Sequence, residues 1–225
     1  MKFINETVTI VRKDILLELR GKEVLSLMTF LSLLLLVIFN FALDLDKVTV
    51  SDFAPGILWV VFAFSGIIGM GRTSMVERDE DAYLSIIFSP ASAESFFTAK
   101  VISNLLFLLT MEVVTVLLFA VLFDFEKLVV FFPRLLPSLL LGSLGFSIIG
   151  TLFSFLSTTS RYGEFLLPFL FLPVVAPILL GGVTSMDKIL SESSEGFSKW
   201  MNILIVFDVM YMVLSLILFR HLLEE

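Results

Sequence analysis

Continuous runs of hydrophobic residues, separated by short polar segments, dominate the sequence. Six of these runs approach the roughly 20 residues that a helix needs to cross a bilayer. They lie near residues 25–43, 54–71, 101–123, 135–158, 165–186 and 201–219. Because the apolar residues are continuous rather than alternating, helices are favoured over the strands of a membrane β-barrel. The pattern predicts an all-α membrane protein with about six transmembrane helices, in one domain covering residues 1–225.

Residues 1–22, which precede the first run, show a different pattern. Five apolar residues recur at helical spacing and share one face, namely Ile4, Val8, Val11, Ile15 and Leu19. Polar residues occupy another face, namely Lys2, Glu6, Thr9 and Lys13. We expect an amphipathic helix that lies in the membrane interface, with its basic residues near anionic head groups. The alternative is a short cytosolic helix packed on a partner.

Composition supports the membrane assignment. Hydrophobic residues make up 58% of the chain and charged residues 16%, and a soluble protein of this size could not hide so much apolar surface. The formal net charge of −7 argues against a nucleic-acid partner. The absence of cysteine excludes a disulfide and a thiolate metal site.

The distribution of Lys and Arg predicts the orientation. If the N-terminus is cytoplasmic, ten basic residues lie on that side and five on the other, and half of the ten precede the first span. Cytoplasmic loops carry the excess of Lys and Arg in membrane proteins. We therefore expect both termini in the cytoplasm.

The sequence offers little for catalysis. It contains no GxxxxGK[ST] phosphate-binding loop, so we expect any ATP to bind a separate chain. Its single histidine, His221, lies near the C-terminus, where a surface residue is more common than a metal ligand. We predict no catalytic residue, no metal site and no enzymatic activity for this chain.

The segment between the second and third spans, residues 72–100, contains the densest charge run, which begins with Glu77, Arg78 and Asp79. After Pro90, the hydroxyl of Ser92 is placed to cap a short helix Ala93–Lys100 with Glu94 in its first turn. Such a charge run is commonly just a solvated face. Its position between two spans favours docking to a cytosolic partner.

Two carboxylates fall inside predicted spans, Glu112 in the third and Asp208 in the sixth. A charge in the bilayer centre is costly, by about 2.5 kcal/mol or more, so each is expected to face the protein interior or to be protonated. One interpretation is an intramembrane polar path for a substrate or a proton. The other is an interhelical hydrogen bond, with Asn40, Asn104, Ser138, Ser143 or Ser147 as candidate partners.

Several of these features resemble a known family. The stretch Ala54–Val60 (APGILWV), which opens the second span, is similar to that of the CcmB family, the ABC-2-type permeases of the haem exporter in cytochrome c maturation. So are Glu77-Arg78-Asp79 followed by Pro90, the pair Ala99-Lys100, and the prolines Pro168, Pro173 and Pro177. The chain departs from the pattern at Asp81 and Leu84, where the family often has glycine and glutamate.

The resemblance implies a permease subunit of the bacterial inner membrane, forming a homodimer on two copies of a CcmA-like ATPase. It implies CcmC-like and CcmD-like membrane subunits, a CcmE-like haem chaperone, and haem as cargo with ATP on the partner. ATP hydrolysis would drive either haem export or release of the haem-loaded chaperone. The ATPase-coupling residues would be Glu77, Arg78, Asp79, Pro90, Glu94 and Phe97. Trp59 and Trp200 are isolated and typical of aromatics at a membrane surface.

Three alternatives remain at this point. The chain could be an ABC-2 permease for another cargo, such as a drug, a lipid or a polysaccharide. It could be a secondary transporter driven by protons through Glu112 and Asp208. It could also be a structural scaffold for a membrane complex.

Overall fold

The computed structural model describes residues 2–43, 49–79, 92–159, 163–193 and 195–224, without the side chains of 74–79, 158–159, 163–168 and 223–224. These residues form helices and connections, with no strand among them. The helices are α1 (Lys2–Gly21), α2 (Glu23–Ala42), α3 (Val50–Asp79), α5 (Ala93–Leu122), α6 (Lys127–Thr159), α7 (Gly163–Leu190) and α8 (Phe197–Glu224).

All helices except α1 are long and apolar enough to cross a membrane, which confirms the six predicted spans. Their outward faces carry large apolar side chains, such as Phe41, Val121 and Phe169, each about 80% or more exposed (85%, 80% and 81%). Many buried side chains are instead serine, threonine or a carboxylate. This distribution suits a protein whose outer surface is covered by lipid.

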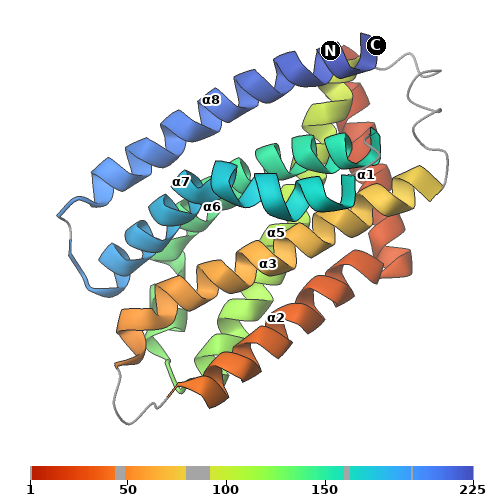
Figure 1. Cartoon of the computed structure of the whole chain (residues 1–225). Coiled ribbons are helices and arrows are strands. Elements are labelled where there is room, and N and C mark those ends of the chain that lie inside the picture. Colours follow the sequence, from red (N-terminus) through yellow and green to blue (C-terminus); the bar gives the residue numbers. More distant parts are fainter. Residues whose placement is uncertain (1, 44–48, 80–91, 160–162, 194, 225) are drawn as a thin grey trace.

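The six long helices run side by side, and α1 lies across one end of the bundle (Figure 1). Both chain termini, the end of α3 and the start of α5 lie at that same end. Helix α6 packs against α3, α5, α7 and α8, while α2 packs against α3 and α5. The two helix ends that flank residues 80–91 therefore lie at the same end of the bundle as α1.

Helices α3 and α5 both extend beyond their predicted spans into residues 72–100, where only a short helix Ala93–Lys100 was expected. Helix α3 continues to Asp79 and α5 begins at Ala93, so the charged run starts on a helix. Ser92 does cap α5, since its side chain accepts a hydrogen bond from the Ser95 amide at 3.2 Å. The capped helix is not short, however: it continues without a break to Leu122.

Trp59 was expected among aromatics at the membrane surface, and the structure shows that this expectation was wrong. Only 2% of the side chain is exposed. Its indole ring packs against α6 at Gly142 and against α7 at Gly182, where the absence of a side chain makes room for the ring. Trp59 thus packs α3 closely against α6 and α7. Trp200, in contrast, is partly exposed near the start of α8.

Candidate functional site at the junction of α1 and α5

Helix α1 attaches to the bundle by a polar face. Its buried residues are Thr7, Asp14 and Glu18, which share one side of the helix because they are separated by seven and four positions. Ile4 and Leu19, on the predicted apolar stripe, are instead 63% and 62% exposed. A helix that buries charge and exposes apolar residues fits the interfacial position expected for it, with lipid on the outside.

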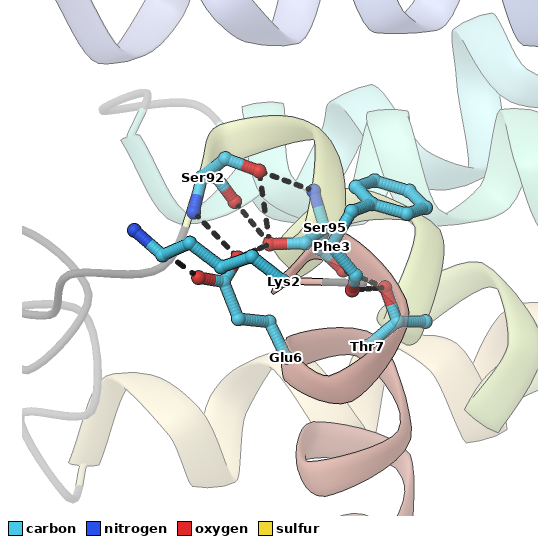
Figure 2. A network of polar contacts seen from close by, with 6 residues as sticks. All are labelled: Lys2, Phe3, Glu6, Thr7, Ser92 and Ser95. Atoms are coloured by element: carbon cyan, nitrogen blue, oxygen red, sulfur yellow. Dashed lines mark hydrogen bonds and ion pairs between the residues drawn. The ribbon is translucent and has the colours of Figure 1, made fainter.

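The first contact joins α1 to the very start of α5 (Figure 2). Glu6 Oε2 accepts a hydrogen bond from the Ser92 amide at 3.2 Å and from the Ser95 hydroxyl at 2.8 Å. The Thr7 hydroxyl donates to the Ser95 carbonyl oxygen at 3.4 Å. The bonds from Ser95 and Ser92 lower the pKa of the Glu6 carboxyl below its ordinary value, because they favour the ionised form.

The second contact is an ion pair further along both helices. Lys100 Nζ lies 2.8 Å from Asp14 Oδ2, and both side chains are less than a tenth exposed, at 6% and 8%. Lys13 approaches the other Asp14 oxygen, Oδ1, at 3.2 Å, but its own side chain is half exposed. The buried pair fixes the position of α1 along α5.

Glu18 joins α1 to the helix that follows it. Its carboxylate accepts hydrogen bonds from the Leu25 amide at 2.8 Å and the Val24 amide at 3.3 Å. These are among the first amides of α2, which have no partner within their own helix. Lys22, between the helices, has a left-handed backbone with φ of 55° and provides no side-chain cap. Glu18 therefore replaces the missing cap across a sharp turn.

Aromatic side chains connect the start of α5 to two other helices. The Phe219 ring of α8 lies 6.2 Å from Phe96, 5.0 Å from Phe97 and 4.6 Å from Phe155 of α6, between ring centroids. Phe97 is fully buried in this cluster. Of the predicted coupling residues on α5, Glu94 is thus partly exposed, whereas Phe97 faces the interior of the chain.

The remaining predicted coupling residues lie on or beyond the end of α3. Glu77, Arg78 and Asp79 belong to its last turns, with side chains outside the described ones, and Pro90 lies outside the described residues. One turn earlier, Arg72 pairs with Glu23 at the start of α2, at 2.6 Å. The end of α3 is therefore tied to α2, which α1 holds through Glu18.

The two intramembrane carboxylates lie on different sides of α6. Glu112 accepts a hydrogen bond from the Ser143 hydroxyl, one of its predicted partners. Asp208 lies against Gly145, and neither of its carboxylate oxygens has a hydrogen-bond partner among the described residues. Asn104 bonds instead to Thr151, at 2.9 Å. The structure does not join Glu112 to Asp208.

The contacts that hold α1 against α5 were not predicted from the sequence. Asp14 and Lys100 are 86 positions apart, as are Glu6 and Ser92, so no local pattern pairs them. A signal was present in the spacing of Thr7, Asp14 and Glu18, which form a polar stripe beside the apolar one.

Comparison with known proteins identifies the family. The model of the CcmB protein family matches residues 5–224, nearly the whole chain. The chain belongs to the CcmB family. It is 25% identical over 191 residues to heme exporter protein B of Pseudomonas aeruginosa, a match that covers 84% of each chain. No solved structure matches it. Membership in this family and the six apolar helices make the chain a multi-pass membrane protein.

Proposed function

We propose that this chain is the permease subunit of an ABC transporter complex that acts in cytochrome c maturation. A separate CcmA-like ATPase supplies the energy, which drives haem export or the release of a haem-loaded chaperone. The match to the CcmB family over residues 5–224 carries the proposal. The chain works as a dimer in the bacterial inner membrane, with both termini in the cytoplasm and CcmC-like, CcmD-like and CcmE-like proteins as partners.

The bundle end that holds α1 is the docking face for the ATPase. The end of α3 and the start of α5 lie there, and each carries predicted coupling residues, Glu77, Arg78 and Asp79 on α3 and Glu94 on α5. Arg72 pairs with Glu23 at the start of α2 and Lys100 with Asp14 of α1, so basic residues lie at this end, in agreement with the excess of Lys and Arg expected in cytoplasmic segments. Phe97, being buried, passes movement to α8 through Phe219 rather than touching the ATPase.

Continuity of α5 explains how movement at this end reaches the membrane. The helix is unbroken from Ala93 to Leu122, so a displacement of its first turn tilts the whole span as a rigid element. The contacts of Glu6 and Asp14 make α1 move with that first turn. The bond between Glu112 and Ser143 connects the middle of the same helix to α6.

Stimulation of the ATPase tests the proposal. The full chain is co-expressed with the CcmA-like ATPase, purified with it, and ATP hydrolysis is compared with that of E77R/R78E. We expect this charge swap to abolish the stimulation while the protein still inserts in the membrane. The control is K127E/E192K, which swaps a pair 3.1 Å apart at the opposite end and also leaves the net charge unchanged. Equal stimulation in wild type and E77R/R78E would refute the coupling role.

A proton-driven secondary transporter is the second candidate, and Asp208 is the observation that favours it. This carboxyl is 5% exposed and without a hydrogen-bond partner among the described residues, an unusual cost for a purely structural residue. The two candidates differ in one outcome. A secondary transporter keeps its activity when the ATPase partner is catalytically dead, whereas the proposed permease loses it.

A further inference from the structure

Helix α1 has a third face, which neither its attachment to α5 nor the proposed coupling uses. At roughly 100° per residue, Arg12, Lys13 and Arg20 fall on the side of the apolar stripe opposite to the buried polar face. Among the described residues, no ion pair is found for Arg12 or Arg20. Two guanidinium groups without an ion-pair partner in the described part of the chain therefore lie on the side of α1 next to the apolar stripe.

A groove lies beside these arginines, between α1 and α5. Its volume is about 430 Å³, and its exposed lining is apolar. The residues that line it are Thr7, Val8, Val11, Arg12, Ile15 and Leu16 of α1, with Ile102 of α5. Ile102 is the second residue of the predicted span 101–123, so the groove lies next to the start of the apolar part of α5.

A second hollow adjoins the groove and contains the basic residues. It has a volume of about 330 Å³ and is lined by Thr9, Arg12, Lys13, Leu16, Leu17 and Arg20. Arg12 and Leu16 line both hollows, so the two are neighbours along the helix. An apolar groove beside a hollow lined by two arginines and a lysine matches a molecule with a hydrocarbon chain and an anionic head.

We propose that this composite site binds an anionic phospholipid, with one acyl chain in the groove against Ile102 and the phosphate beside Arg12 and Arg20. One guanidinium group can donate two parallel hydrogen bonds to the oxygens of a phosphate. An anionic lipid surface also attracts basic residues. The geometry also agrees with the faces of α1: the polar face meets α5, the apolar stripe meets acyl chains, and the basic face meets head groups. The bound lipid covers the only helix of the described set that lies across the bundle.

Native mass spectrometry of the full chain in detergent, titrated with phosphatidylglycerol, measures the affinity of the first bound lipid. We expect R12Q/R20Q to bind about 30-fold more weakly, from the loss of two basic residues near the head group. R12K/R20K should keep most of the affinity. The control R134Q/K199Q removes two charges from the other end of the bundle and should leave it unchanged. Equal weakening in both glutamine pairs would overturn the proposal.

The acyl groove is tested separately with Ile102→Trp, which fills the groove from α5 and leaves both arginines in place. We expect it to weaken phosphatidylglycerol binding as well. Inorganic phosphate should not compete, and competition at millimolar phosphate would contradict a lipid site. Spin labels at Val8 and Leu16 should be relaxed by oxygen in vesicles of phosphatidylcholine and phosphatidylglycerol. Labels shielded from both oxygen and an aqueous relaxing agent would show that a protein covers this face, and the proposal would fall.

Discussion

Lys100 Nζ and Asp14 Oδ2 lie 2.8 Å apart in a buried ion pair that joins the N-terminal helix to a membrane-spanning one. Removing one partner of a buried pair leaves an uncompensated charge and costs about 3–5 kcal/mol. We therefore expect Lys100→Met to destabilise the chain by that order and to release α1. Unfolding in mixed micelles and limited proteolysis of residues 2–21 measure the two effects.

Lys13 provides a matched control, because it approaches the same carboxylate at 3.2 Å but has a half-exposed side chain. An exposed pair contributes about 0–1 kcal/mol, so Lys13→Met should have little effect. The double variant D14L/K100M should recover much of the stability that K100M loses, since no buried charge remains. Equal losses in K13M and K100M would contradict this account of the junction.

Glu6 makes the attachment of α1 sensitive to acid. Its pKa lies below the ordinary value of 4.5 in the folded chain, chiefly because Ser95 donates a hydrogen bond to the carboxylate. The contribution of Glu6 is therefore complete above about pH 4.5 and is lost as the pH falls through the lower folded value. Spin labels at Asn5 and Thr98 should report a longer distance below that pH. In E6Q the distance should already be longer at neutral pH and depend less on acid; an unchanged pH profile would count against the contact.

The hydrogen bond between Glu112 and Ser143 should serve packing. Interhelical hydrogen bonds in membrane proteins average about 0.6 kcal/mol and reach about 1.7, so Ser143→Ala should lower the free energy of unfolding by that amount. Glu112→Gln keeps an acceptor for the serine hydroxyl and should retain both stability and ATPase stimulation. Loss of transport in E112Q with normal stability would point instead to a proton-carrying role for this carboxyl.

Trp59 needs glycine at the two positions against which its ring packs. A Cβ atom at Gly142 would lie 2.8 Å and 3.0 Å from two atoms of the indole ring. Overpacking of this kind costs about 1–3 kcal/mol, so Gly142→Ala should be destabilising, and adding Trp59→Phe should relieve part of the loss. Gly56→Ala is the control, because nothing lies within 4 Å of a side chain there. Thermal unfolding that ranks G56A with G142A would refute the close packing.

Much of this fold follows from the sequence, because a membrane span has a physical signature in a single stretch of chain. Each apolar run predicted from the sequence lies in a helix long enough to cross a membrane. The side chain of Ser92 caps α5, as predicted. The lengths of α3 and α5 were underestimated for a related reason. Hydropathy marks where lipid ends, whereas backbone hydrogen bonding continues into water, so the polar residues 72–79 stay helical.

Contacts between distant positions were harder to predict. Ser143 was one of five candidates for Glu112, and nothing in the sequence ranked it above the others. Asp14 and Lys100 form a buried ion pair, but they are 86 positions apart, so no local pattern pairs them. Trp59 shows the same limit, because the glycines that receive its ring belong to two other helices.

In the proposed coupling, the bundle end that contains the start of α5 faces the cytoplasm and receives the ATPase. The chain has no cysteine, so single cysteines can be introduced at Glu94 and Lys199 without further changes. With a membrane-impermeant maleimide, K199C should react in intact spheroplasts and E94C only after permeabilisation. Co-expression of the ATPase should then protect E94C and leave K199C reactive. Labelling of E94C from outside intact spheroplasts would show that this end of the bundle faces away from the cytoplasm and cannot receive the ATPase.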